Sequence, residues 1–167
     1  INAHSISASN DNVNGHYGIP SGNAGLPKPE IFASGFRNPW SMSKDPSSDD
    51  IYLGDVGGTE EVNRIIPSQH AGKKFGWGAG GNSGAYNCGD AAYVCPMAWY
   101  SGGAVTGVAV KRNIAGNWPA QYLNTVFHSD HKGNWIKYTP IGQNNSQPFD
   151  AGGHQPLGLM FGKLDGN

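Results

Sequence analysis

Apolar residues along the chain come in short runs that alternate with polar residues, and Gly, Pro, Asn, Asp or Ser separates one run from the next. Alternation with a period of two, in runs rich in β-branched and aromatic residues, is typical of half-buried β-strands. Apart from a weak match at 60–66, no stretch keeps the helical spacing of apolar residues without an intervening Gly or Pro. The pattern predicts an all-β fold of antiparallel neighbours, with strands at 30–33, 40–43, 51–54, 62–66, 97–100, 105–111, 125–129, 135–139 and 157–161.

The segments between these runs carry the residues that turns require. The 26 glycines and 11 prolines make up about a fifth of the chain and are spread between the apolar runs. Segments such as KDPSSDD, GAGGNSGA and KLDGN combine Gly or Pro with the small polar residues that favour tight turns. We therefore expect many short strands joined by turns.

Two pairs of segments resemble each other within the chain. RNPWSMSKDPSSDDIYLGD and HQPLGLMFGKLDGN share a polar residue, a proline, an apolar alternation and an acidic turn. IYLGDVG and TVFHSDHKG share a strand that ends in a small residue and Asp. Repeated units of this kind are typical of β-propeller blades, at about 40 to 45 residues per blade. We expect residues 1–167 to form a single partial propeller domain of about three to four blades, truncated at both ends.

The charge of the chain argues against polyanionic partners. The formal net charge is -1, and only 14% of the residues are charged. Nucleic acids and anionic membrane surfaces are bound by clusters of Lys and Arg, which this composition does not provide. The longest apolar runs also fall far short of the roughly 20 residues that cross a bilayer. We therefore expect no nucleic-acid partner and no membrane span.

Two cysteines, Cys88 and Cys95, enclose six residues in the segment CGDAAYVC. This spacing fits a disulfide that closes a small surface loop, whereas a zinc site usually needs a second pair of ligands nearby. Two free buried thiols are the alternative. A disulfide would indicate an oxidising compartment, and we therefore expect an extracellular or periplasmic location.

Several motifs together resemble one protein family. The segments PEIFASGFRNPWSMSKDPSSDDIYLGDVGGTEEVNRI, GKKFGWG, CPMAWYSGGAVTGVAV and WPAQYLNTVFHSDHKGNWIKYT are similar to successive blades of the glucose/sorbosone dehydrogenase family. These are the soluble sugar dehydrogenases that depend on pyrroloquinoline quinone (PQQ). The resemblance covers nearly the whole chain from Pro20 onward. It implies part of a six-bladed β-propeller that holds PQQ and a calcium ion at one mouth of its central channel.

The resemblance places Arg37 and Asn38 against the quinone. PQQ is a planar tricarboxylate, and a guanidinium pairs with carboxylate or quinone oxygens in a bidentate manner. The amide of Asn38 would add a hydrogen bond. The alternative for Arg37 is a local role, in which the guanidinium closes a β-turn onto backbone carbonyls.

The resemblance also aligns Val56, Gly57 and Gly58 with the loop whose backbone carbonyls bind the calcium ion beneath the quinone. Calcium accepts neutral carbonyl oxygens, and glycine allows a close approach of the backbone. We assign Gly57 and Gly58 to the metal and Val56 to the cofactor, with a plain turn as the alternative. The family often has Gln and Pro where this chain has Val and Gly. Asp55 is interpreted as a strand-end cap or turn former.

Three further residues are candidates for contact with the cofactor. Thr106, in the segment AVTG, is similar to a family position whose hydroxyl reaches the cofactor, and an ordinary strand residue is the alternative. His131 and Lys132, in HSDHKGN, fall where the family has a basic residue near the cofactor. The alignment leaves the choice between these two residues open.

Two parts of the family's active site have no match in the chain. The family's catalytic base is a histidine in blades before the segment present here, so we assign no catalytic residue. Where the family carries arginines late in the propeller, this chain has His154 and Gln155 in the segment GGHQPLG. We therefore do not expect the chain alone to supply a complete active site.

Three functions are compatible with these features. The first is that of a fragment of a PQQ- and calcium-dependent sugar dehydrogenase, which oxidises an aldose by hydride transfer to the quinone. The second is a non-catalytic secreted propeller of the same class that binds a partner or a glycan. The third is a structural assembly subunit whose blade edges pair with another chain. The expected partners are a small-molecule sugar and either the remaining propeller blades or another chain.

Overall fold

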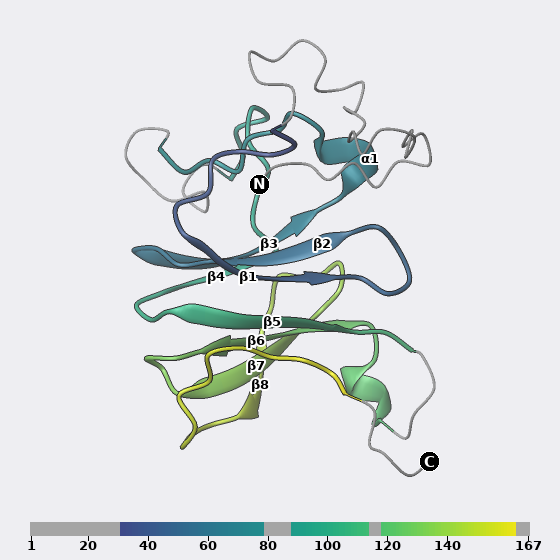
Figure 1. The fold of residues 1–167 in the computed structure, drawn as a ribbon, viewed down its shortest axis with the longest axis vertical. Coiled ribbons are helices and arrows are strands. Elements are labelled where there is room, and N and C mark those ends of the chain that lie inside the picture. The colour runs from purple at the N-terminus through teal and green to yellow at the C-terminus, as the bar shows by residue number, and fades with distance from the viewer. Residues whose placement is uncertain (1–30, 79–87, 114–117, 163–167) are drawn as a thin grey trace, which may run out of the picture. The chain divides into compact units, whose positions relative to one another are not determined.

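The computed structural model describes residues 31–78, 88–113 and 118–162, which belong to two compact units. Unit 1 comprises Ile1–Phe36 and Ile66–Cys95, and unit 2 comprises Arg37–Ile65 and Pro96–Asn167. All regular strands of the described residues lie in unit 2 (Figure 1).

Unit 2 consists of two four-stranded antiparallel sheets, each with its strands in chain order. The first sheet contains β1 (Pro39–Lys44), β2 (Ile51–Asp55), β3 (Thr59–Ile65) and β4 (Ala98–Ser101). The second sheet contains β5 (Val105–Lys111), β6 (Thr125–Asp130), β7 (Trp135–Pro140) and β8 (Gln147–Asp150), and a short 3-10 helix, η4 (Ala120–Tyr122), precedes β6. The predicted all-β fold class is confirmed.

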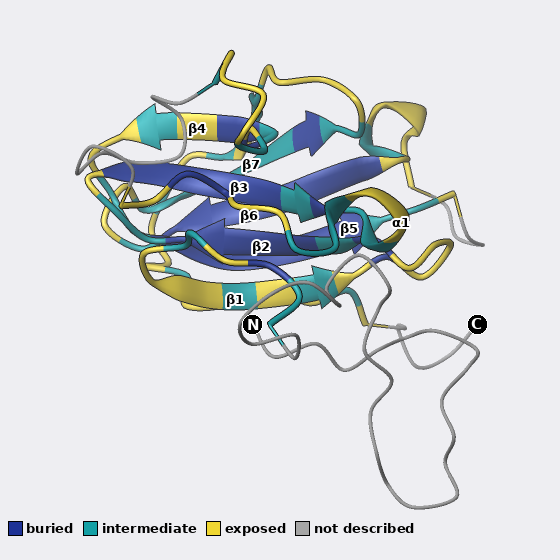
Figure 2. Ribbon diagram, turned by 90° about the horizontal axis from the view of Figure 1, so that it is seen from above, coloured by how far each residue is buried: buried dark blue, intermediate teal, exposed yellow. Residues whose placement is uncertain are grey.

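The hydrophobic core of unit 2 lies between the two sheets. It is lined by residues of β2, β3 and β4 from the first sheet and of β5 and β6 from the second. Buried β2, β3 and β6 are visible in Figure 2, where β1 is mostly exposed. A hydrogen bond of 3.3 Å from the Val110 backbone N–H to Ser43 Oγ also joins β5 to β1. The core residues are Tyr52, Val62, Ala98, Val105, Val108, Val110 and Val126.

The two sheets repeat the same irregularity in their strand pairing. In the first sheet Pro39 pairs with Asp55, and the register shifts directly after this pair. In the second sheet Val105 pairs with Asp130, and the register again shifts directly after the pair. A β-bulge of this kind increases the local twist and re-aims a side chain. The internal similarity of the sequence, in which a strand ends in a small residue and Asp, therefore corresponds to a structural repeat.

The predicted strands differ from the observed ones at three places. The prediction at 105–111 coincides with β5, and those at 40–43, 51–54, 62–66, 97–100, 125–129 and 135–139 overlap the other strands through β7. The sequence pattern did not predict β8. Residues 157–161 were predicted as a strand, but the structure assigns none there. At 30–33, residue 30 lies outside the described residues, and residues 31–33 belong to no strand.

Unit 1 is built from irregular segments around Phe75, which is fully buried and stacks on Phe36 with ring centroids 4.6 Å apart. Its one-turn helix α1 (Pro67–His70) begins with a proline. The predicted disulfide between Cys88 and Cys95 is present, which is compatible with an extracellular or periplasmic protein. In the described part of the chain, none of the helices has the length and apolar character needed to cross a membrane.

His128 is a fully buried polar residue of β6. Its Nε2 atom lies 3.2 Å from Ser146 Oγ and 3.4 Å from Thr139 Oγ1. Burial, reinforced by the positive charge of Lys137, lowers the pKa of His128 from 6.5 to about 4. The folded protein therefore holds this imidazole in its neutral form at neutral pH.

This lowered pKa predicts a loss of stability in acid. Because the unfolded chain binds the proton near pH 6.5 and the folded chain only near pH 4, His128 stabilises the fold fully above about pH 6.5. We expect roughly 3 kcal/mol of that stability to be lost between pH 6.5 and 4. Urea unfolding at several pH values should show a shallower acid slope for His128→Gln than for the wild type. His154→Gln, whose side chain is 69% exposed, is the control and should keep the wild-type slope.

Candidate functional site

Arg37 and Asn38 directly precede β1, at the end of the first sheet where β2 terminates in Asp55. The Asp55 carboxylate accepts a hydrogen bond of 2.9 Å from the Arg37 backbone N–H and one of 2.6 Å from the Asn38 backbone N–H. Asp55 is only 4% exposed. Two partly buried hydrogen bonds to one carboxylate therefore fix the backbone of the pair. In this geometry Asp55 is the strand-end cap that the sequence predicted.

The side chain of Arg37 lies along the loop that follows β2. Its Nη1 atom donates to the Val56 carbonyl at 3.0 Å, and the Val56 N–H donates to the Asn38 carbonyl at 3.0 Å. The local contact that the sequence analysis gave as the alternative for Arg37 is therefore present. Arg37 and Asn38 are both exposed. Because a guanidinium carries several N–H donors, this contact is compatible with recognition of a carboxylate by the same side chain.

Gly57 and Gly58 differ in how closely other atoms surround them. A Cβ atom on Gly57 would lie 2.7 Å from the Thr59 carbonyl oxygen, whereas one on Gly58 would meet nothing within 4 Å. The close approach of the backbone thus requires glycine at position 57 and not at 58. The Gly57 N–H donates to Glu60 Oε1 at 3.2 Å, which ties the loop to β3.

Glu60 joins this loop to the second sheet. It is fully buried, and its Oε2 atom accepts a hydrogen bond of 2.9 Å from the Val105 N–H. Burial raises the pKa of Glu60, and burial likewise raises the pKa of Asp55, although backbone hydrogen bonds oppose both shifts. The sequence pattern did not point to Glu60, because a charged residue in a strand is ordinarily expected to be exposed.

Thr106 and His131 both contact the segment that follows β8. Thr106 is 4% exposed, and its hydroxyl donates to the Pro156 carbonyl at 2.5 Å. His131 Nδ1 lies 3.1 Å from the Gln155 carbonyl oxygen, and the His131 N–H donates to the Ala104 carbonyl at 2.9 Å. A cofactor contact of Thr106 would therefore use its hydroxyl oxygen as an acceptor.

Lys132 and His154 are the exposed basic residues at the same end of the second sheet. The positive charge of Lys132 opposes the rise in the Glu60 pKa that burial causes, so it acts on a residue of β3 in the first sheet. The backbone N–H groups of His154 and Gln155 donate to Asn134 Oδ1 at 2.8 Å and 2.7 Å. Asn134 therefore fixes the backbone at residues 154 and 155, and the His154 side chain remains exposed.

The structure brings these residues into one connected network at one end of both sheets. From Arg37 the hydrogen bonds run through Asp55, the Gly57 loop and Glu60 to Val105. From Thr106, the next residue, they continue through the segment at 155–156 to His131. Asp55 and Asp130 end equivalent strands, so the predicted residues of the two sheets face the same side. Of the interactions described above, the one that links Lys132 to this network is its electrostatic effect on Glu60.

The residues of the network fit the two expected cofactors unequally. The exposed cations Arg37 and Lys132 and the amide of Asn38 match a planar polycarboxylate. Calcium takes about six to eight oxygen ligands, commonly including carboxylates. No cluster of His, Cys, Asp and Glu that could hold a metal occurs among the described residues. A calcium ion at the carbonyls of Gly57 and Gly58 would thus need further ligands from elsewhere.

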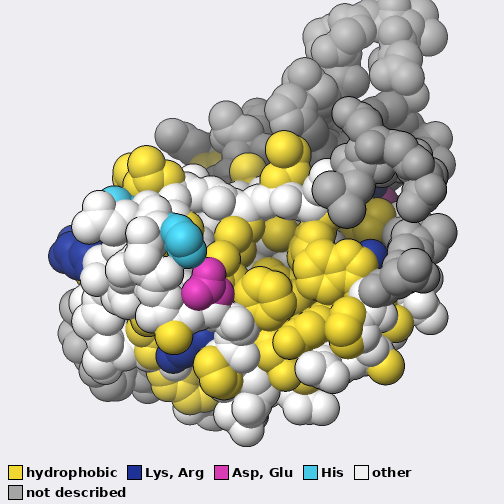
Figure 3. All heavy atoms as spheres, turned by 90° about the horizontal axis from the view of Figure 1, so that it is seen from below, with side chains coloured by type: hydrophobic (Ala, Val, Ile, Leu, Met, Phe, Trp, Pro, Cys, Tyr) yellow, Lys and Arg dark blue, Asp and Glu magenta, His cyan; other side chains and the backbone are white. Residues whose placement is uncertain are grey.

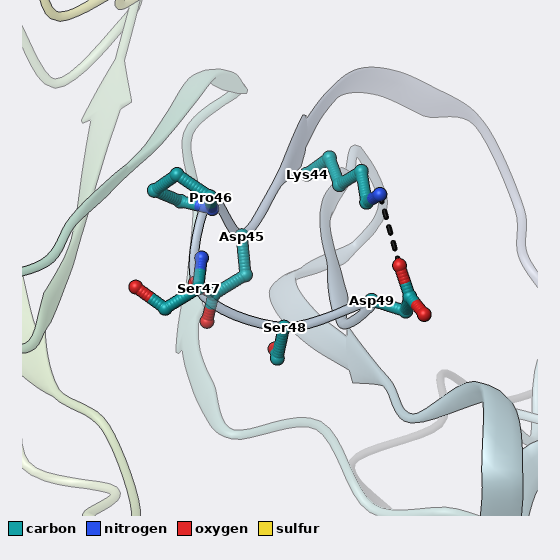
Figure 4. Close-up of a pocket in the computed structure, with 6 residues that line it drawn as sticks. All are labelled: Lys44, Asp45, Pro46, Ser47, Ser48 and Asp49. Atoms are coloured by element: carbon teal, nitrogen blue, oxygen red, sulfur yellow. Dashed lines mark hydrogen bonds and ion pairs between the residues drawn. The ribbon is translucent and has the colours of Figure 1, made fainter.

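A surface hollow lies at the opposite end of the first sheet, on the turn between β1 and β2 (Figure 4). Its two carboxylates are already engaged. Asp49 lies 2.9 Å from Lys44 Nζ, and Asp45 forms an ion pair with Arg112. The Asp45 carboxylate also accepts the Ser47 N–H at 2.8 Å. The hollow therefore serves the turn itself, and we do not assign it a ligand.

Solved structures with a similar fold are sugar dehydrogenases. A glucose dehydrogenase of Thermus thermophilus matches 75% of the chain with a TM-score of 0.56 and 19% identity. The soluble aldose sugar dehydrogenase of Escherichia coli, in its apo form, matches 79% with a TM-score of 0.55 and 22% identity. A further glucose dehydrogenase matches 78% with a TM-score of 0.56 and 17% identity. The resemblance to sugar dehydrogenases is thus confirmed for the fold.

The chain corresponds to only part of these proteins. It spans 35% of the Thermus enzyme and 41% of the Escherichia coli enzyme. No family model and no curated protein matches the sequence. At these identities the similarity defines the fold, namely antiparallel four-stranded sheets of the kind found in propeller dehydrogenases.

Proposed function

We propose that the chain forms one wall of the cofactor site of a PQQ- and calcium-dependent sugar dehydrogenase. The observation that carries this proposal is the presentation of Arg37 and Asn38 by Asp55. The buried carboxylate holds both backbone N–H groups, while both residues remain exposed beside the Gly57 loop. The fold shared with glucose and aldose dehydrogenases supports the same class of function.

The chain's own residues would bind and orient the cofactor. Arg37 and Lys132 would pair with its carboxylates, Asn38 would donate to an oxygen, and the carbonyls of Gly57 and Gly58 would contribute to the calcium site. Bound PQQ supplies the electron sink that accepts a hydride from the anomeric carbon of an aldose. We assign no residue of this chain as the base that takes the hydroxyl proton.

Arg37→Ala in the full-length protein tests the proposal. We expect PQQ binding in calcium-containing buffer, followed by quinone absorbance, to weaken at least tenfold, or about 1.4 kcal/mol, because a charge-assisted contact is lost. Lys44→Ala is the matched control, since Lys44 is an exposed cation at the opposite end of β1. Equal affinities for the wild type and Arg37→Ala would contradict the proposal, and so would a folded protein that binds no PQQ.

One observation favours a non-catalytic binding propeller as the second candidate. The segment at 154–155 is held by Asn134 and His131. The family resemblance aligns His154 and Gln155 of this segment with positions where the family carries arginine. A site without those arginines binds a tricarboxylate less tightly. Binding of a glycan or a protein by a full-length protein that does not bind PQQ would support this second function.

A further inference from the structure

The peptide unit between Val56 and Gly57 is hydrogen-bonded on both sides. Its carbonyl oxygen, which belongs to Val56, accepts the hydrogen bond of 3.0 Å from Arg37 Nη1. Its N–H group, which belongs to Gly57, donates to Glu60 Oε1 at 3.2 Å. A peptide unit is planar, so its C=O and N–H groups rotate together. The contact that Arg37 makes on one side of this peptide therefore depends on the contact that Glu60 makes on the other side.

The local sequence leaves the orientation of this peptide adjustable. Rotation of the peptide changes ψ of Val56 and φ of Gly57, and glycine adopts positive and negative φ with similar ease. The following residue, Gly58, is exposed. The orientation in the structure therefore relies on the hydrogen bonds at the two sides of the peptide.

The carboxylate of Glu60 is itself held by the second sheet. Its Oε2 atom accepts the hydrogen bond of 2.9 Å from the Val105 N–H at the start of β5. Charged side chains are sparse even on the molecular face that Figure 3 shows, which is largely apolar, and Glu60 is fully buried. Burial removes the hydration of a carboxylate, and hydrogen bonds have to replace it. With one N–H group on each oxygen, the Glu60 carboxylate is a fixed anchor for the loop at Gly57.

The equivalent residue of the second sheet shows why position 60 carries an acid. Asn134 is equivalent to Glu60, because each directly precedes the residue that pairs with the acid at the end of its sheet's second strand. Asn134 holds two adjacent N–H groups, those of residues 154 and 155, with one amide oxygen. Glu60 instead holds Gly57 and Val105, each with its own oxygen. A glutamine at position 60 would replace one of these two acceptors with an NH₂ donor.

We propose that Glu60 is a positioning residue of the candidate site, which orients the Arg37 guanidinium through the Val56–Gly57 peptide. This inference rests on the proposed function, in which Arg37 pairs with a carboxylate of the cofactor. Asp55 holds the backbone of Arg37, whereas Glu60 fixes the peptide whose carbonyl the Arg37 side chain contacts. The second sheet thus helps to determine where the first sheet presents its cation.

A double-mutant cycle on PQQ affinity in the full-length protein tests whether Glu60 acts through Arg37. We expect Glu60→Gln to weaken PQQ binding at least about fivefold, because the Arg37 side chain loses its fixed acceptor. In the Arg37→Ala background the same substitution should change the affinity by less than about twofold, since the group that Glu60 positions is absent. Equal losses in the two backgrounds would overturn the inference, and so would an unchanged affinity of Glu60→Gln.

Tyr100→Phe is the matched control, because it removes another hydrogen bond between the same two sheets. The Tyr100 hydroxyl of β4 donates to Asp130 of β6 at 2.6 Å, and this bond does not involve the Gly57 loop. We expect Tyr100→Phe to keep the wild-type PQQ affinity within about twofold, even where its unfolding free energy falls. A loss of affinity as large as that of Glu60→Gln would show that any weakened contact between the sheets has the same effect, and it would overturn the inference.

Amide hydrogen exchange in the cofactor-free protein separates this inference from the proposed function. In Glu60→Gln the N–H of Gly57 or of Val105 loses its acceptor and should exchange at least about tenfold faster than in the wild type. In Arg37→Ala, where Glu60 is intact, the Gly57 N–H should keep its wild-type rate. Fast exchange of Gly57 in Arg37→Ala would show that Arg37 holds the peptide, and unchanged rates in Glu60→Gln would also overturn the inference. A wild-type protein that binds no PQQ would contradict the proposed function, whereas these exchange rates report on Glu60 alone.

Discussion

Asp55→Ala is expected to lower the free energy of unfolding by about 2–5 kcal/mol, because it leaves two partly buried backbone N–H groups without their acceptor. Asp55 is 4% exposed and accepts the N–H groups of Arg37 and Asn38. The substitution should also release Arg37 from its fixed position, so that PQQ binding weakens at least tenfold in protein that remains folded. Urea unfolding and the quinone absorbance titration measure the two effects.

Two variants make this prediction specific. Asp55→Asn retains one acceptor oxygen and should restore part of the stability and of the affinity. Asp49→Ala removes a carboxylate whose side chain is 55% exposed, and it should change the unfolding free energy by less than about 1 kcal/mol. Equal effects of Asp55→Ala and Asp49→Ala would show that the two hydrogen bonds do not hold the strand end.

Arg112→Met is the second substitution with a large expected effect. Arg112 pairs with Asp45, whose side chain is 0% exposed, and removing the cation leaves a buried carboxylate without its partner. Such a change costs about 3–5 kcal/mol. Burial alone would raise the pKa of Asp45, but the hydrogen bonds from Arg112 and Ser47 outweigh it, so the pKa lies below 3.8. We therefore expect the loss in Arg112→Met to shrink in acid, as Asp45 becomes protonated.

An exposed pair on the neighbouring turn supplies the control. Lys44 and Asp49 form an ion pair with side chains that are 54% and 55% exposed. Lys44→Met should cost less than about 1 kcal/mol, because solvent already screens that pair. The double variant Asp45→Asn with Arg112→Met should recover stability relative to Arg112→Met alone. If Arg112→Met and Lys44→Met lowered the unfolding free energy by similarly small amounts, the buried Asp45 carboxylate would not depend on Arg112 for its stability.

The sequence predicted most strands because their apolar residues alternate, and it failed where alternation is not the deciding factor. β8 contains Pro148, which reads as a turn residue, but β8 lies at the edge of its sheet, where proline is tolerated. Residues 157–161 have the alternation of a strand but no paired neighbour among the described residues. A β-strand is assigned only where its backbone is hydrogen-bonded to a partner strand, and the apolar pattern of a single segment does not show whether such a partner exists.

The sequence pointed to the exposed residues of the candidate site and to Asp55 as a strand-end cap, but not to the other buried acids that hold the strand ends. Arg37 and Asn38 were recognisable from their motif, whereas the buried acceptors Glu60 and Asp130 were not assigned a role. Asp130 accepts hydrogen bonds from the Ala104 N–H at 2.8 Å and the Tyr100 hydroxyl at 2.6 Å. The internal repeat did point to Asp55 and Asp130 as equivalent strand ends, but a repeat identifies a position without identifying its hydrogen-bond partners.

The buried acids hold the strand ends through backbone N–H groups, and this has a consequence for how the fold can vary. Every residue except proline offers such a group. Asp55 holds Arg37 and Asn38, and Asp130 holds Ala104 in the equivalent place, although the side chains presented have nothing in common. The same scaffold can therefore display different side chains at each strand end without new anchoring contacts. The side chains at these strand ends can therefore be substituted one at a time while Asp55 and Asp130 keep their hydrogen bonds to the backbone.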